Sequence, residues 1–138
     1  MTAPEFLDTN ILVYAYDASS PAKQPVAQRL LRAALAGQCV VSAQVLAEFS
    51  ETLLGKISPV MSANDLLVLL DALAPIKVVP SGQGMVRRAV EARATYGVHL
   101  YDGMIIAAAE SAGCGRIWSE DLHSGQQYFG IRVENPFR

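Results

Sequence analysis

The sequence predicts an α/β fold, a three-layer α/β/α sandwich around a short and mostly parallel central sheet. Short apolar runs alternate with helical patterns from one end of the chain to the other, as is typical of parallel strands joined by crossover helices. The chain has 138 residues, of which 51% are hydrophobic, enough for one sizeable core. Since no repeat, low-complexity tract or interdomain linker interrupts the pattern, we expect residues 1–138 to form a single domain.

The strands are predicted from apolar runs that are mostly too short to be helices. They cover residues 5–7, 39–42, 76–79, 116–119 and 131–133. Five short strands would make a modest sheet.

The helices are predicted from apolar residues that recur at helical spacing between these runs. Residues 62–74 open with Ser62 and Asp65, a Ser-x-x-Asp signal for the start of a helix, before a leucine-rich run. A short helix is expected after Asp8, and the other predicted helices cover residues 25–36, 43–54, 84–96 and 101–112.

Composition excludes several classes of protein. A net charge of -2 argues against a protein that coats nucleic acid through bulk positive charge, although local basic patches remain possible. Cys39 and Cys114 suggest neither a disulfide framework nor a zinc cluster, so we expect reduced thiols. The N-terminus lacks the layout of a signal peptide, and no apolar stretch approaches the roughly 20 residues that span a bilayer. We therefore expect a cytoplasmic protein with no membrane partner.

Two acids directly follow predicted strands. Asp8 comes after residues 5–7 and begins the triplet Asp8-Thr9-Asn10, while Asp121 comes after residues 116–119. Capping of the next helix is the alternative role for Asp8, and a surface turn is the alternative for Asp121. Glu120 is expected to point elsewhere.

A third acid, Glu48, lies at the edge of the apolar stripe of the helix predicted over residues 43–54. From that edge its side chain can reach toward the strand ends, although a surface role fits its position equally well. We expect Glu51 to point nearly the opposite way, as a solvated surface charge.

The fourth acid, Asp102, lies in the first turn of a predicted helix that is apolar almost all round. A helix-capping role would stabilise the chain by about 0.3 to 1 kcal/mol. However, Asp102 is expected to project on the side of Ile105 and Ile106, which faces protein. A carboxylate held there needs a partner, because an unpaired buried charge is costly. Without a partner, burial raises the pKa of the carboxyl group and favours its neutral form.

All four acids come from strand ends or from helices that begin there, which is the edge where open parallel sheets build their sites. Four carboxylates in one cleft repel one another, and a divalent cation relieves that repulsion. Oxygen ligands without a His or Cys cluster favour Mg²⁺ or Mn²⁺ over zinc, and Mg²⁺ keeps waters that phosphate oxygens can replace. The acids therefore predict a metal site for a phosphodiester substrate.

Four short motifs around these acids resemble the acidic motifs of PIN domains in order and spacing. They are Leu7-Asp8-Thr9-Asn10, Gln44-Val45-Leu46-Ala47-Glu48, Tyr101-Asp102-Gly103-Met104-Ile105 and Ser119-Glu120-Asp121-Leu122. The likeness extends over essentially the whole chain, including residues 133–137. It is closest to the VapC-like ribonuclease toxins of bacterial VapBC toxin-antitoxin systems.

The resemblance implies a Mg²⁺- or Mn²⁺-dependent endoribonuclease that hydrolyses RNA without a covalent enzyme intermediate. It implies that Asp8 and Asp102 are the central metal ligands, supported by Glu48 and Asp121. It also implies a homodimer and an antitoxin partner similar to VapB, whose C-terminal segment lies across the active-site groove.

The resemblance further implies that Asn10 and Ser119 are polar residues that support the ligands. Gly103 is a mild departure, since relatives often carry a larger small residue after the acid. We expect this glycine to loosen the first helical turn by up to about 1 kcal/mol.

Other polar residues are not assigned to the site. His99 and His123 have neither triad nor metal-ligand spacing, so we expect ordinary loop or surface histidines. Arg87, Arg88 and Arg93 cluster on one predicted helix, where contacts with RNA phosphates and a solvated helix face explain them equally well.

Two other functions stay open. One is a housekeeping or DNA-directed PIN-type nuclease, because an acidic pocket does not select the sugar of its substrate. The other is a non-catalytic module that binds RNA or peptide in the groove, with the acids serving only as helix caps.

Overall fold

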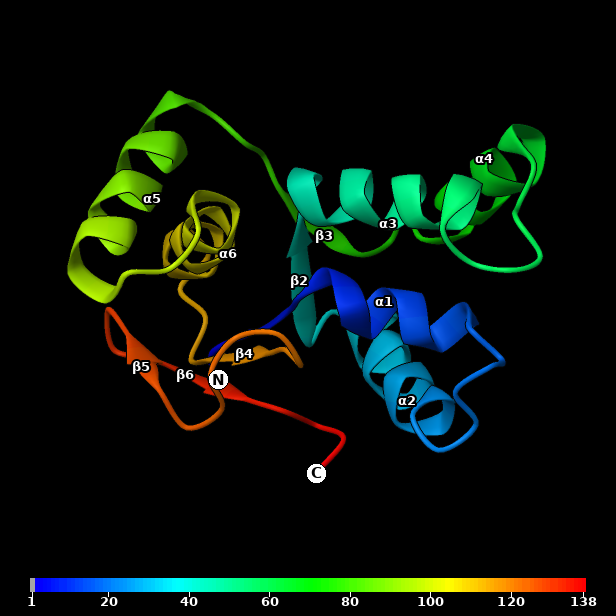
Figure 1. Ribbon diagram of the computed structural model, residues 1–138, viewed down its shortest axis with the longest axis horizontal. Helices are drawn as coiled ribbons and strands as arrows, with labels where there is room; N and C mark the ends of the chain where they lie inside the picture. Colours follow the sequence, from blue (N-terminus) through cyan, green and yellow to red (C-terminus); the bar gives the residue numbers. More distant parts are fainter. Residues whose placement is uncertain (1) are drawn as a thin grey trace.

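A mostly parallel sheet forms the centre of the computed structural model, which describes residues 2–138 (Figure 1). Within these residues the sheet has six strands in the order β3-β2-β1-β4-β6-β5, and only β5 is antiparallel to its neighbour. The strands are β1 (Glu5–Leu7), β2 (Cys39–Ser42), β3 (Lys77–Val79), β4 (Arg116–Trp118), β5 (Gln127–Tyr128) and β6 (Ile131–Glu134).

Helices cover both faces of this sheet, which confirms the predicted sandwich. They are α1 (Thr9–Tyr16), α2 (Gln24–Leu35), α3 (Ala43–Gly55), α4 (Ala63–Ala72), α5 (Gln83–Tyr96) and α6 (Leu100–Ser111). The connections through α1 to α4 step from β1 to β2 to β3, whereas α5 and α6 return from β3 to β4. Right-handed crossovers in opposite directions place the two groups on opposite faces. Figure 1 shows α5 and α6 on one side of β2 and α1 to α4 on the other.

The sequence located the strands well, with one omission. The predictions for residues 5–7 and 39–42 coincide with β1 and β2, and the other three differ from the observed strands by one residue. Strand β5 was not predicted, because it has only two residues and exists through its pairing with β6. The turn between them places Phe129 and Gly130 at positive φ.

The core explains why the central strands are almost wholly apolar. All four residues of β2 are buried, as expected for a parallel strand with helices on both faces.

Cys39 and Cys114 are free and buried, and burial raises the pKa of the Cys39 thiol to about 12. Over residues 2–138, no helix combines the length and apolar character that crossing a membrane requires.

The packing of α5 against α6 gives Gly103 a role that the sequence did not predict. A Cβ atom at this position would lie 2.7 Å from the backbone oxygen of Ala89 on α5. The glycine therefore permits the close approach of the two helices. Sequence reasoning missed this role because the contact joins two separate helices.

Candidate functional site

The candidate site lies where the order of the strands reverses, between β1 and β4. These strands are parallel neighbours, with Leu7 paired to Trp118. The backbone N–H of Asp8 donates to the carbonyl of Trp118 at 3.0 Å, so the residues that follow the two strands emerge side by side. This is the edge where open α/β sheets bind ligands.

Asp8 is the most deeply buried acid of the site. It is 5% exposed and forms the N-cap of α1, with its carboxylate accepting from the Thr9 N–H at 2.7 Å. Its other oxygen accepts from the Ser119 hydroxyl, also at 2.7 Å. Asp8 can therefore cap α1 and belong to the acidic site at the same time.

Burial raises the pKa of the Asp8 carboxyl from its ordinary value of 3.8 to about 6. The hydrogen bonds from Ser119 and Thr9 oppose this rise, whereas the charges of Asp121 and Asp102 add to it. A carboxylate in this position is ionised at neutral pH at a free-energy cost that a cation would relieve.

Ser119 organises the turn that follows β4. Its hydroxyl donates to Asp8 and accepts from the N–H groups of Asp121 and Leu122, both at 3.1 Å. The side chain is fully buried, so these three bonds use the hydrogen-bonding capacity of the hydroxyl without solvent. Ser119 thus links the turn that carries Asp121 to the carboxylate of Asp8.

Asp121 is exposed, and Asn10 holds its side chain. The Asn10 amide donates to Asp121 Oδ2 at 3.1 Å, while its oxygen accepts from the Glu120 N–H at 3.2 Å. The orientation of the amide is set by these two opposite bonds. Asn10 therefore joins α1 to the turn after β4.

Asp102 lies in the first turn of α6 and is half-buried, so it faces protein on one side only. Burial raises the pKa of its carboxyl, the charge of His99 opposes the rise, and the charges of Asp121 and Glu48 add to it. His99 was expected to be an ordinary histidine. It is exposed and precedes α6 as the N-cap residue, as expected, and its charge acts on Asp102.

Glu48 is exposed on α3 and is held by two neighbours. Its carboxylate accepts from the Thr9 hydroxyl at 3.2 Å and from the Gln44 amide at 2.6 Å. The same amide donates to the carbonyl of Tyr101 at 3.1 Å, which ties Glu48 to the start of α6. Sequence reasoning gave Gln44 no role, although its spacing of four residues from Glu48 on one helix was the signal.

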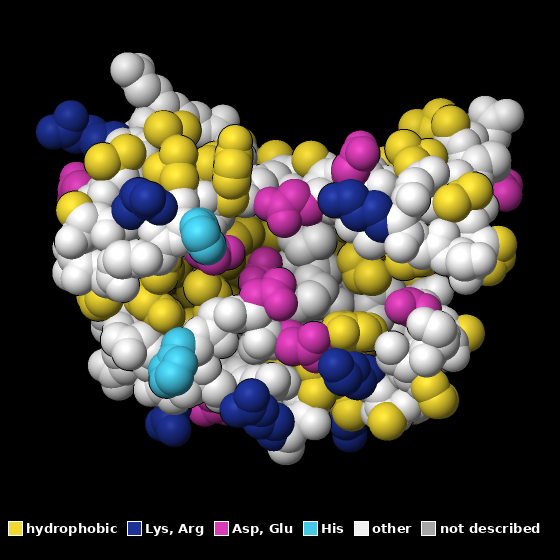
Figure 2. Space-filling model, viewed as in Figure 1, with side chains coloured by type: hydrophobic (Ala, Val, Ile, Leu, Met, Phe, Trp, Pro, Cys, Tyr) yellow, Lys and Arg dark blue, Asp and Glu magenta, His cyan; other side chains and the backbone are white. Residues whose placement is uncertain are grey.

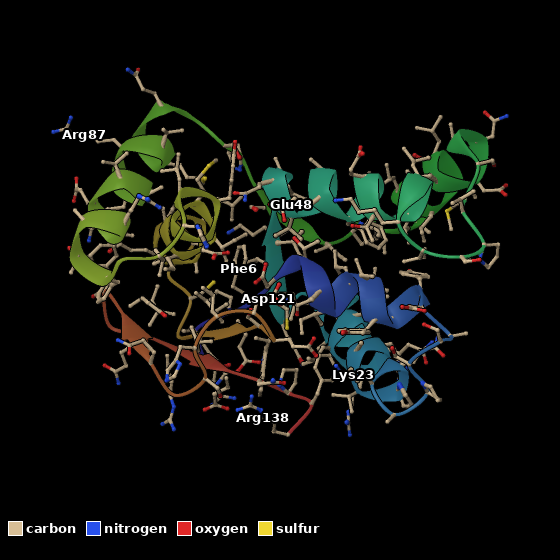
Figure 3. The ribbon with its side chains drawn as sticks, viewed as in Figure 1. Phe6, Lys23, Glu48, Arg87, Asp121 and Arg138 are labelled. Carbon is tan, nitrogen blue, oxygen red and sulfur yellow. The ribbon has the colours of Figure 1, made fainter. Side chains whose placement is uncertain are left out.

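A cavity of about 440 Å³ has walls from α1, α3 and the turn after β4, and it is lined by Glu48 and Asp121 but not by Asp8 or Asp102. Figure 2 shows acidic side chains gathered near the middle of this hollowed face, and Figure 3 places Glu48 and Asp121 there. Glu51 also lines the cavity, so the expectation that it points away from Glu48 was wrong. Residues three apart on a helix differ by only about 60° in direction.

With this geometry established, comparison with known families finds the PIN domain over residues 6–124. The chain belongs to the PIN domain family. Members of this family are generally nucleases that depend on divalent metal ions. No curated protein sequence gives a significant match.

Solved structures support the PIN fold at low sequence identity. A toxin-antitoxin complex from Klebsiella pneumoniae matches with a TM-score of 0.70 and 19% identity, over 96% of this chain and 97% of that one. DNA-bound VapBC from Salmonella typhimurium gives 0.68 and 20%, over 99% of both chains. VapBC2 from Rickettsia felis, bound to a promoter DNA fragment, gives 0.67 and 17%, over 95% of this chain and 97% of that one.

The donor chemistry of this PIN domain fits a hard divalent cation. Asp8, Glu48, Asp102 and Asp121 offer only oxygen atoms, and burial already penalises the charge of the first and third. However, no three Asp, Glu, His or Cys side chains within residues 2–138 converge closely enough to hold one ion.

The basic residues of α5 do not form one surface toward this site. Arg88 donates two hydrogen bonds of 2.8 Å to Glu110 and lies 3.6 Å from the ring centre of Phe129, so it binds protein. Arg93 donates to the carbonyl of Val98 near the end of its helix. Arg87 lies at the edge of the molecule, far from the labelled acids (Figure 3).

Proposed function

We propose that this PIN domain is a Mg²⁺- or Mn²⁺-dependent endoribonuclease that acts as the toxin of a type II toxin-antitoxin pair. The observation that carries the proposal is Asp8. Its buried carboxylate, with a pKa raised to about 6, lies at the switch point of the sheet, where the charges of Asp121 and Asp102 act on it. Although Thr9 and Ser119 donate hydrogen bonds to this carboxylate, it has no cationic partner among residues 2–138, and a hard cation would supply the missing counter-charge.

In this proposal Asp8 and Asp102 are the central ligands, and Glu48 and Asp121 complete the set. A bound divalent cation supplies a Lewis acid for the phosphodiester and lowers the pKa of a water molecule. The protein's own contribution is to orient the acids. Ser119 holds Asp8 through a bond of 2.7 Å, and Asn10 holds Asp121 through one of 3.1 Å.

The choice of RNA and of partners rests on similarity. The Salmonella and Rickettsia neighbours are VapBC complexes with DNA, and the Klebsiella neighbour is a toxin-antitoxin complex. By analogy, we propose a VapB-like antitoxin as the partner of this chain and a homodimer as its assembly. The acids do not select a sugar, so a DNA-directed nuclease is the competing function.

The proposal is tested by cleavage of labelled RNA and of DNA of matched sequence, with Mg²⁺ or Mn²⁺ titrated into chelator-treated protein. We expect RNA cleavage that requires the metal, and a loss of at least about 100-fold in Asp8→Asn and Asp102→Asn. Asp71→Asn, an exposed acid on α4, is the matched control and should cleave like the wild type.

Equal activity in all four proteins, or activity that survives chelation, would overturn the metal mechanism. Preferential cleavage of the DNA would leave the metal site intact and replace the ribonuclease by the competing function. Specific binding of RNA with no cleavage under any metal condition would instead indicate a non-catalytic module.

A further inference from the structure

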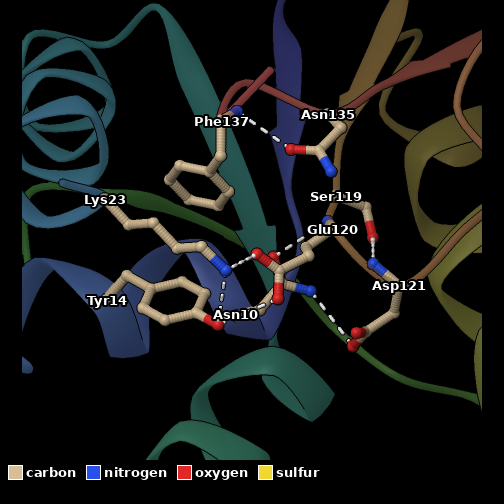
Figure 4. Close-up of polar contacts among 8 residues, drawn as sticks. All are labelled: Asn10, Tyr14, Lys23, Ser119, Glu120, Asp121, Asn135 and Phe137. Atoms are coloured by element: carbon tan, nitrogen blue, oxygen red, sulfur yellow. Dashed lines mark hydrogen bonds and ion pairs between the residues drawn. The ribbon is translucent and has the colours of Figure 1, made fainter. Parts of the chain in front are cut away.

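Lys23 and Glu120 form an ion pair beside the candidate site, and Glu120 directly precedes Asp121 in the turn after β4. The Lys23 ammonium donates to Glu120 Oε2 at 2.5 Å, and the Tyr14 hydroxyl donates to Glu120 Oε1 at 2.8 Å. Lys23 also donates to the Tyr14 hydroxyl at 3.2 Å. Figure 4 shows these contacts together with those of Asn10 and Asp121.

Helix α1 binds both the backbone and the side chain of Glu120. Asn10 and Tyr14 are four residues apart and therefore lie on one face of this helix. Asn10 accepts from the backbone N–H of Glu120, and Tyr14 donates to its carboxylate. Since Asn10 also donates to Asp121, the placement of Glu120 determines where Asp121 is held.

Aromatic rings fix the position of Lys23 itself. Its ammonium lies 4.7 Å from the ring centre of Tyr14 and 5.6 Å from that of Phe137, and the two rings meet edge to face at 5.1 Å. Phe137 belongs to the C-terminal tail, so three separate segments hold the lysine. Cation-π contacts of this kind favour a charged, oriented ammonium group.

Glu120 and Asp121 are adjacent in sequence and line the same cavity. What separates them is their partners: Glu120 binds Lys23 and Tyr14, whereas Asp121 binds Asn10. Without the lysine, the Glu120 carboxylate would be an unneutralised charge on the wall of the candidate metal site.

We propose that Lys23 and Glu120 are positioning residues: the ion pair anchors the turn that presents Asp121, and Lys23 withholds the Glu120 carboxylate from the cation. This inference rests on the proposed function, because it concerns the same metal site. It predicts that the effect of Lys23 on metal binding depends on the presence of the Glu120 charge.

The test compares Lys23→Met, Glu120→Gln and the double variant with the wild type, and measures Mn²⁺ affinity by calorimetry together with kcat and KM on RNA. Arg32→Met removes the same charge from an exposed position on α2 and is the control. Thermal melts establish that each variant is folded.

We expect Lys23→Met to bind Mn²⁺ about 10-fold more tightly, because Glu120 becomes available, and to lose about 10-fold in kcat with little change in KM. The double variant should return to within about 3-fold of the wild-type Mn²⁺ affinity while its kcat stays low. Arg32→Met should match the wild type in both measurements.

An equal gain in Mn²⁺ affinity with and without Glu120 would overturn the inference, since Lys23 would then act only as a distant charge. A Lys23→Met variant that binds and cleaves like Arg32→Met would also overturn it. In both cases the wild type still binds Mn²⁺ and cleaves RNA, so the proposed function stands. A wild type that binds no Mn²⁺ would refute both proposals together.

Discussion

The four acids of the site divide into an inner pair, Asp8 and Asp102, and an outer pair, Glu48 and Asp121. Burial raises the pKa of both inner carboxyl groups, and Asp8 is only 5% exposed. Both outer acids are exposed and are held by hydrogen bonds from neighbouring side chains. The inner charges therefore cost folding free energy, while the outer charges are solvated and oriented.

This difference suggests that the two pairs contribute to the site in different ways. Inner acids are costly to ionise and therefore favour a bound cation energetically, whereas the exposed outer acids cost little to ionise and contribute through their position. Substitutions in the inner pair should therefore change the stability of the metal-free protein, and substitutions around the outer pair should change metal affinity and activity with little effect on stability.

The largest expected effect on stability is at Asp8. Its pKa is about 6 in the folded chain and 3.8 ordinarily, so the folded chain binds the proton more tightly than the unfolded chain. The free energy of unfolding should therefore fall as pH rises through this window and stay lowered above it. We expect Asp8→Asn to raise the free energy of unfolding at pH about 7.5, without metal, by about 1 to 3 kcal/mol.

Urea denaturation in chelator at acidic and at neutral pH measures this effect, with Asp71→Asn as the control. The gain should shrink at pH about 4, where the Asp8 carboxyl of the native wild type is protonated and therefore uncharged, like the amide of Asp8→Asn. Added Mn²⁺ should stabilise the wild type and not Asp8→Asn. A gain that is the same at both pH values would show that the charge of Asp8 is not its cause.

The second prediction concerns the support of the inner pair. Gly103→Ala places a Cβ atom 2.7 Å from the Ala89 oxygen, so α5 and α6 must separate. Although alanine is the better helix former, we expect a loss of about 1 to 3 kcal/mol in the free energy of unfolding. Chemical denaturation measures the loss, with Gly84→Ala on α5, where a Cβ meets open space, as the control. A stabilised Gly103→Ala would contradict the packing role.

The smallest expected effect on stability is at Asn10. Asn10→Ala removes the bonds to Asp121 and to the Glu120 N–H, both at the surface of the molecule. We expect a change of no more than about 1 kcal/mol in the free energy of unfolding, but a loss of about 10-fold in Mn²⁺ affinity or activity. Asn64→Ala, at an exposed site on α4, should change neither. A large loss of stability without a change in metal affinity would contradict the division between the pairs.

Much of the fold could be read from local pattern. The strands β1 and β2 were predicted at their observed bounds, and the cap of Ser62 on the Asp65 N–H was predicted and is present. These features depend on residues within a few positions of one another. The two-residue strand β5 depends on pairing with β6, so its own sequence gave no signal.

The candidate site was predicted less completely. Four acids were named, and the strand order explains why the two that follow β1 and β4, Asp8 and Asp121, lie at one sheet edge. The placement of Glu51, the coupling of His99 to Asp102 and the binding of Arg88 to Glu110 were not foreseen. The first was an error in helical direction, and the second is a charge effect between residues three apart in the sequence. The third joins side chains on two separate helices, which local sequence does not specify.

The sequence by itself determined which residues can do chemistry and in which order strands and helices follow, because these depend on residue type and short-range spacing. Only the tertiary structure decided which acids are buried and which are exposed. Asp8 and Ser119 are 111 residues apart in the chain yet share a hydrogen bond of 2.7 Å. The pKa of Asp8 is set by that contact, by burial and by charges from other elements, none of which exists until the sheet has formed.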